Sequence, residues 1–375
     1  MSTTGLLPAR FSPVRWSREV QVLVLTLVGI GAIAAFPLFA EARWLMNIAF
    51  FTLMFAALGT SWNLVAGYTG YISLGTIAFF GLGAYGFAWG LDHGGIEGTV
   101  VPFLLVPLIG IAVGLASVPL AFIAFRTRGS VFILVTITYV LMFEYLAFNL
   151  TGITQGSRGY RVPLPSLGIG TFEVVFFEAM LIVLAVGLLI CWYLRSAPIG
   201  LAMFAVRDDE DRAAGIGVLT AWPKYMAFGL AAFLAGMVGA LWAYRIGYIY
   251  PQFAFDPGPL LIGTVLVALF GGIGTLWGPT VGAFILIPLE QELAFRLGGR
   301  QLYLLVYVLI FIAVMRLLPR GILPTISNLL ARLRRTRAAS NHAVDEGMGT
   351  SAEPAHGEVP DRALLSVGSD GRERR

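Results

Sequence analysis

Long runs without a charged residue dominate the chain, and the charged positions fall between these runs. Residues 44–91 contain no charged side chain at all. A helix rises about 1.5 Å per residue and the apolar core of a bilayer is about 30 Å thick, so this run is long enough for two crossings. We expect the chain to turn back within Gly67–Gly70, because glycines mark breaks in helical segments.

The same criterion, applied along the sequence, predicts an all-α polytopic membrane protein with about ten transmembrane helices. The expected crossings are 20–40, two within 44–91, 99–125, 131–150, 174–194, 225–244, two within 257–289, and 301–315. The two long runs are expected to break at Gly67, Gly70 and Gly75, and at Gly271, Gly272, Gly274, Gly278 and Pro279. Two interpretations of these glycines stay open: close packing of helices, or broken and re-entrant helices that expose backbone to a solute.

Composition agrees with an integral membrane protein. Hydrophobic residues make up 58% of the chain, charged residues 12%, and the mean hydropathy is +0.82. The net charge of +4 comes almost entirely from arginine, a pattern that reports membrane topology rather than binding of nucleic acid. With Cys191 as the only cysteine, the chain lacks an internal disulfide, and we predict neither a metal nor another cofactor.

The basic residues also predict an orientation, because arginine and lysine concentrate in short cytoplasmic loops. Ten crossings place both termini on one side, and the larger share of basic residues falls on that side. The inner group is Arg10, Arg15, Arg18, Arg126, Arg128, Arg195, Arg207, Arg212, Lys224, Arg316 and Arg320; the outer group is Arg43, Arg158, Arg161, Arg245, Arg296 and Arg300. We therefore expect a cytoplasmic segment at 1–19, a transmembrane domain at 20–325, and a basic, then disordered cytoplasmic tail at 326–375.

A compact charged insert at 196–224 interrupts the apolar sequence. Its first part, 198–204, is apolar; its second part, 207–212, has four consecutive acidic residues between two arginines; and glycines follow at 215 and 217. One interpretation is a short helix on the membrane face that docks into a groove of a cytosolic partner. The other is a solvated loop that follows the positive-inside rule, and the local charge pattern leaves both open.

Candidate catalytic groups are scarce. The sequence holds three histidines, one cysteine and a single lysine, Lys224, whose neighbours exclude a phosphate-binding Gly-Lys-Ser/Thr motif. We therefore do not expect an enzyme. Glu144 is the best-placed acid within a predicted crossing, where ionisable residues are usually functional. It equally fits a position near the outer surface beside Asn149, and both interpretations stay open.

Residues 62–85, WNLVAGYTGYISLGTIAFFGLGAY, resemble the signature of the permease subunits of branched-chain amino-acid ABC importers. The resemblance continues in 126–129, in the charged insert, in 269–279 and in 319–321, and covers about 44–325. It implies a permease in a bacterial inner membrane, working with a second permease subunit, two cytosolic ABC ATPase subunits and an extracytoplasmic solute-binding protein. ATP hydrolysis would then belong to the ATPase subunits.

The resemblance also gives roles to individual residues. The family's coupling loop has an acid, two alanines and a later glycine, and the charged insert matches this spacing. The residues predicted to couple the ATPases are Pro198, Leu201, Phe204, Arg207, Asp208, Asp209, Glu210, Ala213, Ala214 and Gly217.

A polar set predicts the solute path: Asn63, Tyr68, Tyr71, Ser73, Thr76, Glu144 and Asn149. Hydroxyl groups and the ends of broken helices would satisfy the charged ends of a zwitterionic amino acid in passing. The wider group also contains permeases for urea, amides and sugars, so fold kinship alone does not select the solute. A different class, an ion-coupled secondary transporter, would need paired acids deep in the membrane, where only Glu144 is available.

Overall fold

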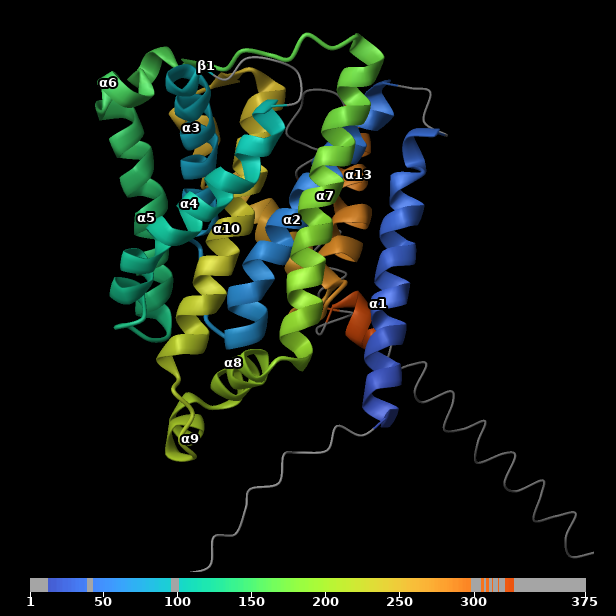
Figure 1. Ribbon diagram of the computed structural model, residues 1–375, viewed down its shortest axis with the longest axis vertical. Helices are drawn as coiled ribbons and strands as arrows, with labels where there is room; N and C mark the ends of the chain where they lie inside the picture. The colour runs from blue at the N-terminus through green and yellow to red at the C-terminus, as the bar shows by residue number, and fades with distance from the viewer. Residues whose placement is uncertain are drawn as a thin grey trace, which may run out of the picture. The chain divides into compact units, whose positions relative to one another are not determined.

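The computed structural model describes residues 13–38, 43–95, 101–297 and 321–326, together with isolated positions between 305 and 316. Within these residues the chain is almost entirely helical (Figure 1). An antiparallel ladder pairs β1 (Tyr160–Arg161) with β2 (Tyr248–Ile249). The prediction of an all-α polytopic fold is confirmed. The predicted crossing 301–315 and the predicted tail 326–375 lie almost wholly outside the described residues, as does most of 1–19.

The helices follow one another with short connections. In chain order they are α1 (Pro13–Ala34), the 3-10 turn η1 (Phe36–Leu38), α2 (Arg43–Thr69), α3 (Thr76–Gly94), α4 (Val101–Ala124), α5 (Ser130–Asn149), α6 (Thr151–Thr154), the 3-10 turn η2 (Gly156–Arg158), α7 (Ile169–Ser196), α8 (Pro198–Asp208), α9 (Glu210–Gly215), α10 (Ala221–Ile246), α11 (Pro251–Ala254), α12 (Pro259–Gly271) and α13 (Gly278–Leu297). The short helices α8 and α9 lie at one end of the long helices, and α6 and β1 lie at the other (Figure 1).

Six stretches of the described residues are long and apolar enough to cross a membrane. They are α2, α4, α5, most of α7, α10, and the segment Pro251–Gly271 that contains α11 and α12. The count of about ten is therefore not confirmed. Val20–Ala34 is a shorter apolar helix, and α3 and α13 carry the glycines and charged residues that lower their hydropathy.

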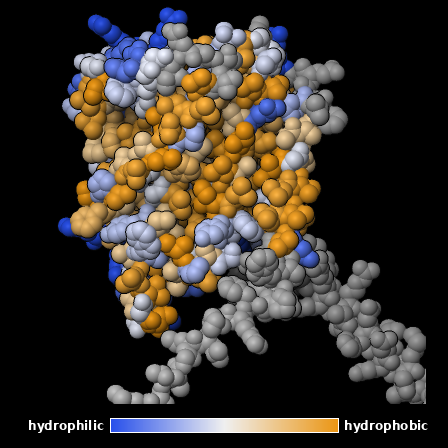
Figure 2. All heavy atoms as spheres, in the orientation of Figure 1, coloured by the Kyte–Doolittle hydropathy of each residue, from blue (hydrophilic) through white to orange (hydrophobic). Residues whose placement is uncertain are grey.

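The centre of the molecule is formed by α2 and α10. In its most apolar window α2 is 78% buried and α10 is 72% buried, whereas α4 and α5 are each 28% buried. Ser61 of α2 donates a hydrogen bond of 2.7 Å to the carbonyl of Ala231 of α10, deep in the core. The outer helices present their apolar side chains to the surroundings, and Figure 2 shows an apolar belt between more hydrophilic ends. This belt matches a protein surrounded by lipid.

Glycines bring α3 and α10 into backbone contact. A Cβ atom at Gly83 would lie 2.1 Å from the carbonyl oxygen of Gly236, and one at Gly239 would lie 1.9 Å from that of Phe80. Lipid supplies little hydrophobic drive between helices, so contacts through small residues provide much of the packing energy. This closely packed centre holds the ends of α2 and α10 beside α8.

Candidate coupling site and solute path

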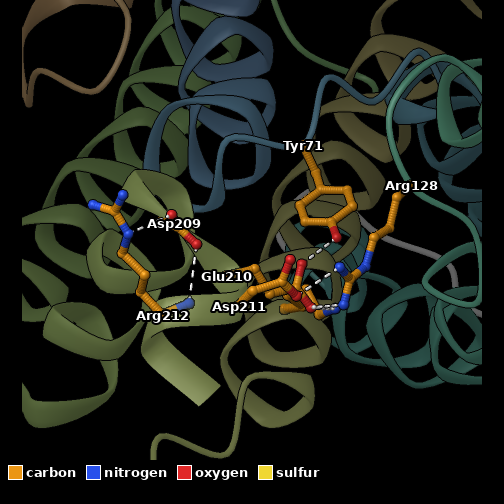
Figure 3. Close-up of polar contacts among 7 residues, drawn as sticks. Tyr71, Arg128, Asp209, Glu210, Asp211 and Arg212 are labelled. Carbon is orange, nitrogen blue, oxygen red and sulfur yellow. Dashed lines mark hydrogen bonds and ion pairs between the residues drawn. The ribbon is translucent and has the colours of Figure 1, made fainter. Parts of the chain in front are cut away.

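Two short helices form the charged insert. Ala197 is extended and Pro198 occupies the first turn of α8, where its fixed φ suits a helix start. Asp209 ends α8 and begins α9: its Oδ1 accepts a hydrogen bond of 3.0 Å from the backbone N–H of Arg212, and its Oδ2 lies 3.0 Å from the Arg212 guanidinium (Figure 3). This aspartate cap explains why the charged run forms a second, separate helix.

Glu210, the first residue of α9, joins this helix to the start of α10, to the loop after α2 and to the loop before α5. Its Oε1 accepts a hydrogen bond of 2.6 Å from the Nζ of Lys224 in α10. Its Oε2 accepts a short hydrogen bond from the hydroxyl of Tyr71, in the loop between α2 and α3 (Figure 3). Arg128, from the loop before α5, lies 3.5 Å from Oε1. One carboxylate therefore fixes α9 against the ends of α2, α5 and α10.

The charges around Glu210 act on its protonation. Burial by itself raises the pKa of Glu210, but hydrogen bonds from Lys224 and Tyr71, with the charges of Lys224 and Arg128, lower it below the ordinary value overall. The pKa of Tyr71 is raised, first by burial and then by the hydrogen bond to Glu210. The phenol therefore stays protonated and donates to an ionised carboxylate.

The opposite face of α9 and the loop after it are exposed. Ala213 points inward and is 3% exposed, whereas Ala214 and Gly217 are exposed. Beyond α9 two large apolar side chains are mostly exposed, Ile216 at 80% and Leu219 at 82%. We call these two residues the apolar tip. Sequence reasoning missed them, although their position just after the family's Glu-Ala-Ala spacing was a usable signal.

The helix α8 packs on the end of α2. Met203 is fully buried, Leu201 is 47% exposed, and Asp208 is exposed. The ring of Phe204 lies 4.9 Å from that of Tyr68. The guanidinium of Arg207 donates a hydrogen bond of 2.5 Å to the carbonyl of Gly67 in α2. Like Glu210, the predicted coupling residues Phe204 and Arg207 therefore contact the bundle itself, although the Arg207 residue as a whole is exposed.

The two glycine-rich segments lie against each other. The helix α2 ends at Thr69 and α3 begins at Thr76, while α12 ends at Gly271 and α13 begins at Gly278. Asn63 of α2 joins the two segments with both ends of its amide group. Its Nδ2 donates to the carbonyl of Thr275 at 3.0 Å, and its Oδ1 accepts from the N–H of Gly274 at 2.7 Å.

Within the second segment the chain closes tightly on itself. Gly272 and Gly274 adopt positive φ, and a Cβ at Gly271 would lie 1.6 Å from the carbonyl oxygen of Gly278, next to Pro279. The first segment likewise has positive φ at Gly70, while Gly75 precedes the first turn of α3.

Most of the predicted path residues are enclosed by protein. Asn63, Tyr68, Ser73 and Thr76 are at most 4% exposed. The hydroxyl of Tyr68 donates to the carbonyl of Cys191 at 3.3 Å, and the indole of Trp62 donates to the carbonyl of Ser73 at 2.7 Å. These groups hold the first glycine-rich segment in place.

Tyr71 lines a cavity of about 210 Å3 beside Arg207. Glu144 and Asn149, both on α5, make no contact with the other predicted path residues through the hydrogen bonds or ion pairs of the described residues, and the amide of Asn149 bonds back to the carbonyl of Tyr145 at 2.7 Å.

A second buried ion pair lies at the other end of α10, and sequence reasoning missed it. The Nη2 of Arg245 lies 2.6 Å from the Oε2 of Glu173 in α7, and its Nη1 donates to the Oδ1 of Asn47 in α2 at 3.1 Å. The guanidinium also stacks 4.3 Å from the ring centre of Phe50. Glu173 and Arg245 each lie one residue outside a predicted crossing, 174–194 or 225–244. In the sequence their charges mark only the ends of these crossings, and no local pattern pairs them.

The described residues contain no group of three or more histidine, cysteine, aspartate or glutamate side chains arranged to hold a metal ion. The site is built instead from ion pairs and exposed apolar side chains, which suit the binding of another protein.

Residues 44–315 match the model of one protein family, described as branched-chain amino acid transport system / permease component. The chain belongs to this family. It is therefore an ABC-importer permease component and a multi-pass membrane protein, rather than an enzyme. No solved structure matches the chain.

Three similar permeases are compared with the chain by identity and coverage. The high-affinity branched-chain amino acid transport system permease protein LivM of Escherichia coli K12 is 28% identical over 327 residues, covering 80% of this chain and 75% of LivM. LivM of Salmonella typhimurium gives the same identity and coverage. The autoinducer 2 import system permease protein LsrC of Salmonella paratyphi B is 30% identical over 113 residues, 29% of this chain and 33% of LsrC. Similarity to LivM thus extends along most of this permease component, whereas similarity to LsrC is local.

Proposed function

We propose that this chain is one permease subunit of an ATP-driven importer that moves branched-chain amino acids across a bacterial inner membrane. Its partners are a second permease subunit, two cytosolic ABC ATPase subunits and an extracytoplasmic solute-binding protein. The similarity to LivM over 80% of the chain supports this solute class. The local similarity to LsrC, which serves a different solute, supports only the shared transport architecture.

The movement of the ATPases reaches the permease through α8 and α9. The main support for this is the set of contacts made by Glu210. A carboxylate held by Lys224, Tyr71 and Arg128 makes α9 move together with the ends of α2, α5 and α10. The exposed apolar tip beyond α9 supplies surface that an ATPase would bury. This end of the bundle is then the cytoplasmic end, in agreement with its basic residues.

The transport cycle needs two states of the permease that the ATPases bind with different affinity. Closure of the ATPases on ATP would move α8 and α9 and exchange an outward opening for an inward one. The solute needs a route and little affinity, because recognition belongs to the binding protein. Tyr71 and the hydroxyl groups near the glycine-rich segments remain our prediction for that route.

Reconstitution into liposomes tests this proposal. The permease pair, ATPases and binding protein are purified together, and uptake of labelled leucine is measured with and without ATP in the presence of a protonophore. We expect uptake to require ATP, to survive the protonophore, and to be competed by isoleucine and valine. Uptake that needs only the proton gradient would identify a secondary transporter. If urea or amides competed with uptake and isoleucine did not, the proposed solute class would be wrong.

A further inference from the structure

Arg207 caps the end of α2. The hydrogen bond of 2.5 Å from its Nη1 goes to the carbonyl of Gly67, two residues before the last residue of that helix. The last four carbonyl groups of an α-helix lack partners within the helix, and the helix dipole is negative there. A guanidinium at this position therefore donates a hydrogen bond to an unpaired carbonyl group, and its positive charge is attracted by the negative end of the helix dipole.

The same guanidinium reaches the second glycine-rich segment. A Cβ atom at Gly274 would lie 2.2 Å from the Nη1 of Arg207 and 3.0 Å from the carbonyl oxygen of Gly67. Gly274 has a φ of +77°, which also favours glycine. Asn63 holds the N–H of Gly274 from the other side at 2.7 Å. We call Asn63, Gly67, Arg207 and Gly274 the break junction, because they connect both glycine-rich segments to α8.

Arg207 differs from its basic neighbours. Lys224 contacts Glu210 at 2.6 Å, Arg128 contacts Asp211 at 2.9 Å, and Arg212 contacts Asp209 at 3.0 Å. Those contacts join side chains, whereas Arg207 binds the backbone at the point where α2 ends. A movement of α8 transmitted through Arg207 therefore acts on helix ends directly.

We propose that Arg207 is the positioning residue that transmits the movement of α8 to both glycine-rich segments, and that it acts inside the permease rather than as an ATPase contact. This rests on the proposed function, since α8 must move with a cytosolic partner. The cavity of about 210 Å3 lined by Thr69, Gly70, Tyr71 and Arg207 gives the side chain room to move. Loss of its contact to Gly67 frees the end of α2 and the loop of Gly274 together.

The test compares Arg207→Ala with Arg126→Ala in the reconstituted importer. Arg126 is a matched control, because its replacement removes the same charge at the same end, and its exposed side chain lies over the ring of Phe122, away from α8 and α9. Three quantities are measured: the ATPase that co-purifies, the rate of ATP hydrolysis, and solute uptake per ATP hydrolysed. For Arg207→Ala we expect unchanged co-purification and a fall of about tenfold in uptake per ATP, a typical size for coupling between sites. Arg126→Ala should keep the original ratio.

Conservative replacement and a double-mutant cycle separate coupling from simple damage. Arg207→Lys keeps the charge and one donor, so we expect part of the lost ratio to return. Asn63→Ala loosens Gly274 from the other side, and its effect should not add to that of Arg207→Ala, because both act through the break junction. Additive effects, or an unchanged ratio in Arg207→Ala, would overturn the inference.

Two outcomes distinguish this inference from the proposed function. If the unaltered permease binds no ATPase, the proposed function fails and the inference fails with it. If the ATPase binds and Arg207→Ala transports normally, the inference alone is wrong. Should Arg207→Ala not reach the membrane, Arg207→Gln is measured instead, with the same expected and contradicting results.

Discussion

The Nζ of Lys224 lies 2.6 Å from the Oε1 of Glu210, and both side chains are nearly enclosed, at 6% and 13% exposure. The only lysine of the chain thus meets the first acid of α9. Removing one member of a buried ion pair leaves an uncompensated charge, which costs far more than the pair contributes as a whole. This contact therefore fixes α9 to the transmembrane bundle.

Replacing Glu210 with alanine should detach α9. The loss of the partner of Lys224 should lower stability by about 3 kcal/mol, as expected for breaking a buried pair. Heat-induced loss of the monodisperse protein in detergent measures this change. Asp211→Asn is the matched control, because Asp211 is 81% exposed and surface pairs contribute little. Equal midpoints for the two variants would contradict the assigned role of Glu210.

Acid should weaken the same contact. The folded pKa of Glu210 lies below its ordinary value, so the stability it contributes is present above the ordinary pKa and lost as pH falls through the folded pKa. Midpoints of heat denaturation are compared between the unaltered protein and Glu210→Gln, from neutral pH to below about 4.3, the ordinary pKa of glutamate. The difference between the two proteins should shrink in acid. A difference that stays constant with pH would argue against an ionised Glu210.

The pair of Arg245 and Glu173 offers a test at the other end of the bundle. Arg245→Met alone should cost about 3–5 kcal/mol, because it leaves Glu173 buried and unpaired. The double change Arg245→Met with Glu173→Leu should recover most of that loss, since apolar residues of similar size often replace a buried pair at little cost. Both are measured by heat denaturation in detergent. A double variant as unstable as the single one would show that the pair is not the relevant interaction.

The apolar tip should bind the ATPase without stabilising the permease. Ile216→Ser with Leu219→Ser should reduce co-purification of the ATPase by at least about tenfold, because each large apolar side chain buried contributes about 1.5–3 kcal/mol. Heat stability of the permease should not change, since both residues are more than three-quarters exposed. Ile153→Ser, a 55% exposed position on α6 at the opposite end, is the control. Normal co-purification would place the ATPase contact elsewhere.

Charge-free length predicted the helical fold and most helix positions. The run 44–91 does divide into α2 and α3, and α4, α5, α7 and α10 overlap their expected ranges closely. The number of crossings could not be settled in this way, because α3 and α13 carry glycine and charged residues within helices of 19 and 20 residues. Periodicity and length do not distinguish a buried, polar-rich membrane helix from an interrupted one.

Contacts between residues far apart in the chain could not be predicted from the sequence. Glu210 was identified from its spacing, but its partners Tyr71, Arg128 and Lys224 come from three other segments and no local pattern connects them. The sequence predicts Asn63 along the solute path, whereas its amide is occupied by the backbone of Gly274 and Thr275. Polar residues in membrane helices serve either purpose, and only their three-dimensional neighbours separate the two.

The central claim, that α9 and the loop after it dock onto an ATPase, is tested most directly by cross-linking in living cells. A photoreactive amino acid is placed at Ile216, and the same amino acid at Ile153 serves as the control. The account predicts an adduct with a nucleotide-binding subunit from Ile216 and none from Ile153. Absence of that adduct from Ile216 in cells that accumulate the solute would contradict it.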